Sequence, residues 1–440
     1  MWTIIDGKRY DITDFIEKHP GGSDLLMLAV GRDASVMFHS YHRRYKVVTK
    51  RLQGFKVLAD LPDPKKDGSK LTGKPLPRES ERPVVGRHPA VSTPLYNEIR
   101  DEVNAYFRET GLSSRGGMVT KSVLLFALTL ATYYAAAVMQ YYYLAPVLGY
   151  LLAMCGLAIQ HDANHGAFHK NENVSRIFGL LDDFIGGSSL LWRHQHNIAH
   201  HAHPNDHEMD ADTFSQYPIM RMNPKLPLRA YLRAQHIYAP FLYTLIGMMY
   251  SFLDVLSYLQ GRHEHIRLQA LRFQDKFFFW AGKIVHFGLM LAIPIYLVGW
   301  FEAIFYFYLP TELCGGFFLA SVFAVSHNSE VTAYNVPRDM DWAETQIRTS
   351  CNWGPKSKFW LYTVGGLNFQ IEHHLFPGVA HTHYPAIGAI VKRVAKKHNI
   401  PYGEFEHFRT LYKSHLSTLY RLGHFHTLAE AEAAEAKKSN

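Results

Sequence analysis

Residues 151–165 have the sequence LLAMCGLAIQHDANH, in which an apolar run ends directly at the histidine pair His161 and His165. The run completes an uncharged stretch that begins after three tyrosines, 141–143, and another uncharged stretch, 122–139, precedes these tyrosines. Each stretch is long enough to cross the roughly 30 Å hydrocarbon core of a bilayer as a helix. Tyrosines are enriched at membrane interfaces. The pattern therefore predicts a transmembrane hairpin with histidines at its end.

A second pair of apolar stretches, 277–301 and 303–325, predicts another hairpin, so we expect about four transmembrane helices. Two further apolar stretches are ambiguous. Residues 177–192 are interrupted by two aspartates, and residues 237–256 have no such interruption until Asp254. We expect both stretches to lie along the membrane interface or to re-enter the membrane rather than to span it.

The net charge of +8 suits either nucleic acid or the anionic surface of a membrane. Basic residues gather beside the predicted spans, at 108–121, 221–233, 262–276 and after residue 338, whereas the hairpin tips lack them. This distribution argues against nucleic-acid binding, and the positive-inside rule places both termini in the cytosol. We expect no cleaved secretory leader, because the first ten residues have no basic flank followed by an apolar core.

Many of the 27 histidines lie in clusters beside the predicted spans. Besides HDANH at 161–165, the chain contains HNIAHH at 196–201 and QIEHH at 370–374, and His327 directly follows the second hairpin. Histidines four apart share one face of a helix, so several imidazoles can converge on one metal centre. Lone histidines such as His169 would merely cap spans, but clusters need another explanation. Imidazole suits iron, copper, zinc and nickel alike, so the residues leave the metal open.

The N-terminal segment contains the motif His19-Pro20-Gly21-Gly22, and His42 lies 23 positions after His19. Two imidazoles and small residues can hold a flat haem, and two imidazole ligands leave no open position for oxygen on its iron. Such a site passes electrons. His39 lies three residues before His42 and is a competing second ligand. The three cysteines lack paired spacing, which argues against a disulfide framework or a thiolate metal site.

Composition divides the chain into four parts. Residues 1–58 alternate short apolar runs with turns and form a small domain, and 59–92 form a linker that is rich in Pro, Gly, Lys and Asp. Thr93-Pro94 is a typical helix start. It opens a large membrane domain, 93–427, and residues 428–440 form a C-terminal tail.

With Asp6-Gly7-Lys8-Arg9-Tyr10-Asp11 before it and Gly31-Arg32-Asp33-Ala34 after it, the HPGG motif resembles cytochrome b5, in the form that is fused to front-end desaturases. HDANH, the HxxxHH cluster and QIEHH extend the resemblance to front-end fatty acid desaturases over nearly the whole chain. The most specific sign is Gln370, which stands where other membrane desaturases carry histidine. The resemblance implies a small α+β cytochrome b5-like haem domain joined to an all-α integral membrane desaturase domain.

The resemblance also implies the site residues. His19 and His42 are the axial ligands of haem b, with His42 preferred to His39 because the family places its second ligand in a phrase like Phe38-His39-Ser40-Tyr41-His42. Gln370 completes or shapes the catalytic site, and Asp162, Asn164, Asn205 and Asp210 support the metal ligands. Glu372 is either a general base or a supporting carboxylate. Two iron ions are bound by eight histidines: His161, His165, His196, His200, His201, His327, His373 and His374.

The implied activity is insertion of a cis double bond between the carboxyl end and an existing double bond of a polyunsaturated fatty acyl chain. O₂ is the co-substrate, and electrons come from NADH through cytochrome b5 reductase and the fused haem domain. The acyl chain arrives on a phospholipid or on coenzyme A. A sphingolipid long-chain-base desaturase and a di-iron lipid hydroxylase are alternatives, and a membrane haem carrier without catalytic activity is a third. The enzyme class and the lysines 437 and 438 indicate the endoplasmic reticulum, with the active site facing the cytosol.

Overall fold

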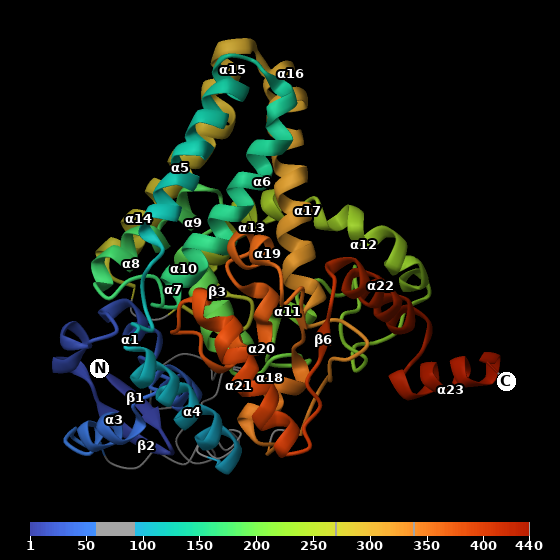
Figure 1. Ribbon diagram of the computed structural model, residues 1–440. Helices are drawn as coiled ribbons and strands as arrows, with labels where there is room; N and C mark the ends of the chain where they lie inside the picture. The colour runs from blue at the N-terminus through green and yellow to red at the C-terminus, as the bar shows by residue number, and fades with distance from the viewer. Residues whose placement is uncertain (59–92, 269–270, 338, 440) are drawn as a thin grey trace.

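The computed structural model describes residues 1–58, 93–268, 271–337 and 339–439 (Figure 1). Its N-terminal part is small and mixed in structure. Strands β1 (Trp2–Ile5) and β2 (Lys8–Asp11) pair in antiparallel register through a turn at Asp6 and Gly7, both of which have positive φ. Helices η1 (Thr13–Lys18), α1 (Ser23–Leu28), α2 (Ser35–Tyr41) and α3 (Tyr45–Leu52) follow. The predicted α+β class of this domain is confirmed, while the predicted linker 59–92 lies outside the described residues.

Helix α4 (Pro94–Thr110) begins where Thr93-Pro94 predicts it. The Thr93 hydroxyl accepts a hydrogen bond from the backbone N–H of Tyr96, which satisfies one of the free donors of the first turn. The helix ends at Gly111, whose φ of 65° is the left-handed conformation that glycine adopts without strain.

Four helical segments are long and apolar enough to cross a membrane: Val119–Val138, Tyr142–Asn164, Phe273–Val298 and Trp300–Val325. They rise as one bundle from the body of the molecule (Figure 1). The two predicted hairpins are therefore confirmed. Their regular parts are α5 (Val119–Tyr133), α6 (Ala145–Cys155), α7 (His161–Asn164), α14 (Phe273–Phe287), α15 (Ile293–Val298), α16 (Trp300–Glu302) and α17 (Leu309–Val325), and their π-helical turns are η3 (Tyr134–Val138), η5 (Gly156–Gln160), η8 (Gly288–Ala292) and η9 (Ala303–Tyr308), with the 3₁₀ turn η4 (Tyr142–Leu144) before α6.

Helices α6 and α17 approach each other closely at Gly149. A Cβ atom at this position would lie 2.0 Å from the carbonyl oxygen of Thr311, so no larger residue fits. Small residues at such crossings let membrane helices pack backbone to backbone. The contact fixes the span that ends in His161 against the span that leads to His327.

The two ambiguous stretches do not form straight spans. Residues 177–192 belong to three short helices, α8 (Glu172–Gly179), α9 (Leu181–Phe184) and α10 (Ser189–Arg193), which agrees with the expectation that they do not cross. Residues 237–256 belong to the pair Ala230–Tyr243 and Ile246–Gln260, which is bent by 82°. This pair consists of η7 (Ala230–Ala234), α12 (Gln235–Tyr243) and α13 (Ile246–Gln260).

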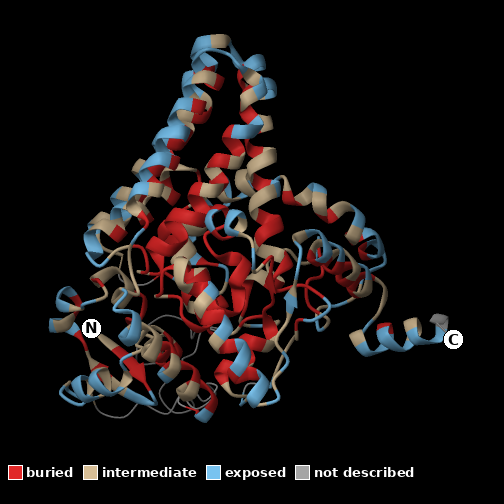
Figure 2. Ribbon diagram, in the orientation of Figure 1, coloured by how far each residue is buried: buried red, intermediate tan, exposed pale blue. Residues whose placement is uncertain are grey.

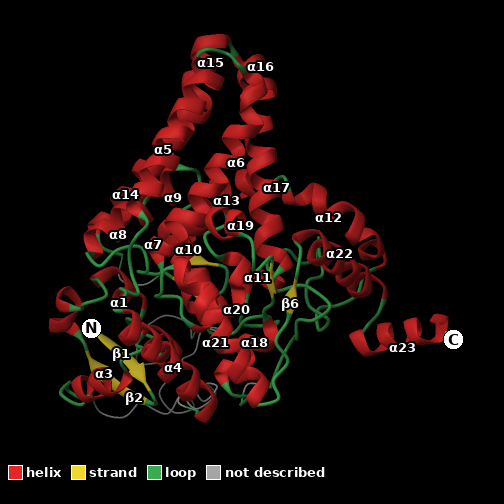
Figure 3. Cartoon of the chain, viewed as in Figure 1, coloured by secondary structure: helices red, strands yellow, loops and turns green. Residues whose placement is uncertain are grey.

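The body below the spans holds most of the buried residues (Figure 2), and the few short strands in it lie among helices (Figure 3). Its elements are η6 (His194–His200), α11 (Ala211–Phe214), β3 (Arg262–His263), β4 (Ile266–Arg267), α18 (Trp342–Thr349), β5 (Asn352–Trp353), α19 (Lys358–Thr363), η10 (Leu367–Phe369), α20 (Gln370–Leu375), η11 (His381–His383), α21 (Tyr384–Lys397), β6 (Glu404–Phe405), α22 (Phe408–His424) and α23 (Leu428–Ser439). Strands β5 and β6 pair in parallel, and β3 and β4 pair in antiparallel register.

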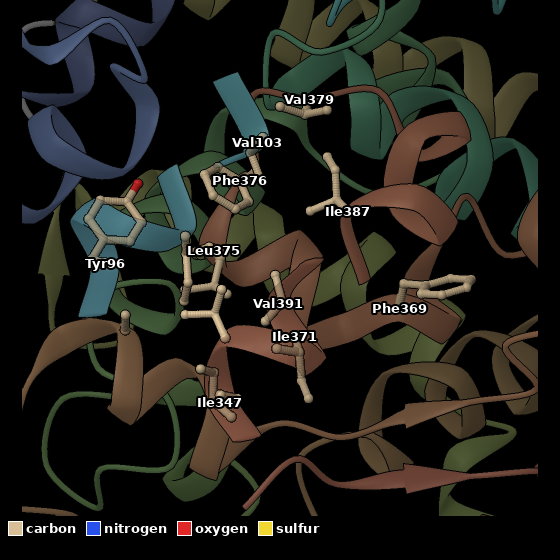
Figure 4. Close-up of a cluster of buried hydrophobic side chains, with 14 of the residues drawn as sticks. Tyr96, Val103, Ile347, Phe369, Ile371, Leu375, Phe376, Val379, Ile387 and Val391 are labelled. Atoms are coloured by element: carbon tan, nitrogen blue, oxygen red, sulfur yellow. The ribbon is translucent and has the colours of Figure 1, made fainter. Parts of the chain in front are cut away.

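An apolar core holds α20 in place. Ile371 and Leu375 of this helix are fully buried against Ile347 of α18, Val391 of α21 and Tyr96 of α4 (Figure 4). Ile371 and Leu375 lie four residues apart on one face of α20, and the histidines of QIEHH lie on the same short helix. The core therefore fixes the position of His373 and His374 from the side opposite to the spans.

Candidate metal centre and haem pocket

The eight predicted metal ligands are all buried and gather below the spans. Their ring nitrogens form two groups in which one nitrogen of each residue lies within 4.8 Å of the others. The first group is His161, His165, His196 and His373, and the second is His200, His327 and His374. His201 joins the first group, since its Nε2 lies 3.1 Å from Nε2 of His196 and 3.0 Å from Nε2 of His373.

The HNIAHH cluster reaches the site through a π-helix rather than the α-helix that its spacing suggests. In η6, the N–H of His201 donates to the carbonyl oxygen of His196, five residues earlier. A π turn places residues five apart on one face, which brings these two rings together. His200 stacks beside His196 with ring centroids 5.1 Å apart. All three histidines therefore join the site, as the spacing predicts.

In the second group, each imidazole has its Nδ1 engaged on the outer side. Nδ1 of His200 lies 3.1 Å from a carboxylate oxygen of Asp210, Nδ1 of His327 donates to the carbonyl oxygen of Thr349 at 3.0 Å, and Nδ1 of His374 lies 2.7 Å from Oε1 of Gln346. All three partners are acceptors, so each ring carries a proton on its Nδ1. Such outer partners orient metal-bound imidazoles and raise their basicity.

The Nε2 atoms of this group consequently face one another. Nε2 of His327 lies 3.3 Å from Nε2 of His200 and 3.1 Å from Nε2 of His374. Lone pairs at this separation repel unless a proton or a metal ion lies between them. Three imidazole Nε2 atoms are a donor set that suits a divalent transition metal.

In the first group, several ring nitrogens have no hydrogen-bond partner. Both ring nitrogens of His161 and Nε2 of His165 are buried without a hydrogen-bond partner. A buried nitrogen without a partner is costly, and a metal ion would remove the cost. Burial lowers the pKa of His165, His196 and His373 well below the ordinary value, so these rings are neutral and able to bind a cation.

The pKa of His200 is shifted in the opposite direction from the pKa values of His165, His196 and His373. Burial lowers its pKa, but the carboxylates of Asp210 and Asp212 outweigh burial and raise the pKa to about 9. The site thus favours positive charge beside His200, whether it is a proton or a metal ion. Asp210, which was expected to support a metal ligand, is fully buried with its carboxylate 3.1 Å from Nδ1 of His200.

The other predicted supporting residues have different partners. Asn205 donates from its amide to the carbonyl oxygen of His327 at 2.8 Å. Asn164 instead donates to Gln160, and Asp162 pairs with His381 at 2.8 Å, so neither of these contacts a ring of the eight-histidine site. Glu372 is buried and binds Asn352 and Tyr402, which leaves it without a hydrogen bond to the site histidines.

Gln370 lies at the edge of the second group. Its amide Nε2 is 2.9 Å from Nε2 of His327, so the amide meets the same lone pair that faces His200 and His374. Residues that sequence reasoning missed also touch the rings. Gln346 holds His374 and also donates to the carbonyl oxygen of His201, and the Tyr384 hydroxyl lies 3.4 Å from Nδ1 of His373.

The predicted haem ligands face each other in the N-terminal domain. The ring centroids of His19 and His42 are 6.0 Å apart, and their Nδ1 atoms bind the carbonyl oxygens of Gly22 and Phe38, which leaves both Nε2 atoms directed inward. This spacing fits an iron ion between two imidazoles. A Cβ at Gly21 would lie 2.9 Å from the ring of His19, so glycine is needed there. Nε2 of His39, the competing ligand, instead binds the carboxylate of Asp6 at 2.9 Å.

Two family models match the chain. One, described as fatty acid desaturase, matches residues 119–406, and the other, described as cytochrome b5-like heme/steroid binding domain, matches residues 1–76. The chain is 35% identical to "Acyl-lipid (7-3)-desaturase, chloroplastic" of Chlamydomonas reinhardtii over 91% of its own length and 76% of that protein. It is 32% identical to "Acyl-lipid (8-3)-desaturase" of Physcomitrium patens, over 96% and 88%, and 30% identical to "Delta(5) fatty acid desaturase A" of Dictyostelium discoideum, over 96% and 90%.

Proposed function

The chain belongs to the fatty acid desaturase family and carries a cytochrome b5-like domain, and from this we propose that it inserts a cis double bond between the carboxyl end and an existing double bond of a polyunsaturated fatty acyl chain. The observation that carries the proposal is the joint presence of eight converging histidines below the spans and an opposed histidine pair in the fused domain. A haem carrier without catalytic activity would not need the first of these sites.

We propose that the acyl chain is presented on a lipid rather than on coenzyme A. The relatives from Chlamydomonas reinhardtii and Physcomitrium patens both have names that specify acyl-lipid substrates. A substrate anchored in the bilayer also suits a site that lies directly at the ends of two membrane spans, as His161 and His327 do. Such a substrate reaches the histidines without leaving the membrane.

The reaction consumes one O₂, two electrons and two protons for each pair of hydrogens removed, and yields two water molecules. When bound by the eight histidines, two iron ions would supply the oxygen activation that an unactivated methylene requires. His200 and His327 are held for this task by Asp210 and the carbonyl oxygen of Thr349. We propose that Gln370, the first residue of the QIEHH cluster, shapes the metal site beside His327. Burial of the whole set keeps bulk water away from the histidines.

The N-terminal domain is proposed to hold haem b between His19 and His42. The opposed rings support this assignment, and the engagement of His39 by Asp6 supports His42 as the second ligand. We infer that this domain receives single electrons from a cytochrome b5 reductase that oxidises NADH. The protein is integral to the membrane, and we propose the endoplasmic reticulum with the histidine site on the cytosolic face, where the basic residues beside the spans belong.

Lipid analysis in yeast tests the function. The chain is expressed, cells are fed a panel of polyunsaturated acids, and total fatty acids are examined by mass spectrometry. We expect a product two mass units lighter than its precursor, with the new bond on the carboxyl side of an existing one. The His373→Ala variant should lack this product, and His426→Ala, which changes an exposed histidine, should retain it.

Other outcomes would replace the proposal. Products that gain oxygen would identify a hydroxylase. A new double bond in long-chain bases alone would identify a sphingolipid desaturase. Well-expressed protein that alters neither lipid class would leave the haem carrier as the remaining function.

A further inference from the structure

Tyr41 joins the haem domain to the histidine site. It directly precedes the proposed haem ligand His42 in the chain, and its hydroxyl lies 2.7 Å from Nδ1 of His165. We infer that Tyr41 is the electron-coupling residue between the two sites, an inference that rests on the haem and iron assignments of the proposed function. The peptide between Tyr41 and His42, the phenol ring and one hydrogen bond then form a continuous path.

The haem domain is docked so that this hydrogen bond has a fixed geometry. Asp24 of α1 forms ion pairs with three arginines of the desaturase domain, Arg176, Arg193 and Arg272, and its side chain is only 15% exposed. Such a network differs from an exposed pair, because the carboxylate is largely withdrawn from water. The Asp24 network fixes the contact between the haem domain and the desaturase domain at helix α1.

A second set of contacts lies nearer to Tyr41. The Arg43 guanidinium donates to the side-chain oxygen of Asn104 in α4 at 3.2 Å, and the Asn104 amide donates back to the carbonyl oxygen of Arg43 at 3.1 Å. These reciprocal bonds hold the residue that follows His42. Tyr41 is therefore held between anchored neighbours and cannot easily swing away from His165.

The chemistry of His165 fits a role in coupling. Its Nε2 has no hydrogen-bond partner and faces His161, His196 and His373, so Nε2 is the atom that would bind metal. A metal-bound imidazole donates its other N–H to an outer acceptor, and here the acceptor is the Tyr41 oxygen. The two rings also lie nearly parallel, 30° apart, with centroids separated by 6.3 Å.

No other hydrogen bond from residues 1–58 to one of the eight site histidines is present in the part of the chain that the structure describes. The haem domain also approaches the site at Leu25, but that contact is apolar: a Cβ added at Gly166 would lie 2.9 Å from Cδ1 of Leu25. Such a contact gives neither a covalent nor a hydrogen-bonded connection. The tyrosine path is therefore the more direct one.

The electron balance is simple. Each passage would take one electron from ferrous haem held by His19 and His42, leaving it ferric, and would give that electron to one ferric ion held by the histidine site, leaving it ferrous. Tyr41 gains and loses nothing, and the proton of the hydrogen bond stays between the phenol and the imidazole. Two passages supply the two electrons that one desaturation consumes.

The test is anaerobic flash photoreduction of the full chain, loaded with haem and iron, with a flavin as the photoreductant. The absorbance of ferrous haem is followed as it reoxidises, and the same protein without iron shows how much of the decay depends on the metal. Tyr41→Phe removes the hydroxyl and keeps the ring. Tyr106→Phe is the matched control, because Tyr106 also bonds a histidine, His383 at 3.3 Å, which is not one of the eight.

We expect Tyr41→Phe to slow haem reoxidation per bound iron by about tenfold or more, the scale of activity that is lost when the outer partner of a metal-bound imidazole is removed. Tyr106→Phe should match the wild type, all three proteins should share one haem spectrum and one haem reduction potential, and the rates are compared per bound iron. An unchanged rate in Tyr41→Phe overturns the inference. So does loss of iron with an unchanged rate per iron, which would make Tyr41 a positioning residue only.

The measurement needs neither lipid nor oxygen, so it separates this inference from the proposed function. If iron-dependent reoxidation requires Tyr41 but no lipid product is found in yeast, the coupling stands and the assigned reaction fails. If products form but haem reoxidation in the wild type is independent of iron, the reaction stands and the coupling path fails.

Discussion

Asp210 and Asn205 link two histidines that come from distant parts of the chain. The Asp210 carboxylate binds Nδ1 of His200 and also accepts the backbone N–H of Asn205 at 2.8 Å. The amide of Asn205 then donates to the carbonyl oxygen of His327 at 2.8 Å. One buried network thus sets the orientation of a ligand from HNIAHH and of a ligand at the end of a membrane span.

Replacing Asp210 by Asn should weaken metal binding by about 10–100-fold, because the substitution removes the negative charge beside His200 and leaves one acceptor oxygen in place of two. Iron content after dialysis against a chelator measures the effect. Asp212→Asn is the control: Asp212 lies 3.3 Å from the same ring, but its side chain is 38% exposed, so its loss should matter less. Equal iron content in Asp210→Asn and wild type would contradict the assignment.

Gln346 should matter for activity as much as the outer hydrogen-bond partners of the other proposed metal ligands. Gln346→Leu removes the acceptor for Nδ1 of His374, and we expect desaturation to fall by about 10–100-fold. Gln346→Glu keeps an acceptor at that position and should retain more activity than the leucine variant. Product yield per unit of membrane protein is the measurement, and identical yields in the two variants would show that the acceptor is unimportant.

The absorbance spectrum of the haem distinguishes the two candidates for its second ligand, His42 and His39. His42→Ala should abolish the spectrum of haem with two imidazole ligands. His39→Ala should preserve it, because Nε2 of His39 is bound to Asp6 and does not face His19. The reverse result would make His39 the ligand.

Docking of the haem domain should depend on Asp24. Burial raises the pKa of this carboxyl, but Arg193, Arg176 and Arg272 outweigh burial and lower it. Because the folded pKa is depressed, the stabilisation is present above the unfolded value of about 3.9 and is lost as the pH falls through the folded pKa. Asp24→Asn should remove it at neutral pH, which hydrogen exchange of the amides in Ser23–Leu28 would detect as faster exchange. Protection that is unchanged in this variant would assign docking to the other contacts.

The core behind α20 should be sensitive to truncation. Ile371 is fully buried, and Ile371→Ala should cost about 2–5 kcal/mol through lost burial and the cavity that remains. Thermal unfolding in detergent should show a lower midpoint and earlier loss of iron than Leu112→Ala, which truncates an exposed residue. Equal midpoints would mean that the core does not support the site.

The sequence allowed prediction of the spans and of the eight histidines that meet, because apolar length and histidine clustering are local signals. Partners such as Gln346 and Tyr41 gave no local signal. Gln346 precedes His374 by 28 positions and Tyr41 precedes His165 by 124, so only folding brings each pair together. Asp162 was expected to support a metal ligand, and its carboxylate lies instead 2.8 Å from Nδ1 of His381, a partner 219 positions away in the chain.

Because His194–His200 is a π-helix, residues five apart share one face in the second histidine cluster. His196 and His201 meet because one residue more than an α-turn separates them. Wound as an α-helix, which turns by about 100° per residue, the same segment would place His196 and His201 about 140° apart around the helix axis. All three histidines would still be present in such a protein, but His196 and His201 could no longer point at one place. For this segment, the winding of the backbone is thus as much a determinant of the site as the histidines themselves.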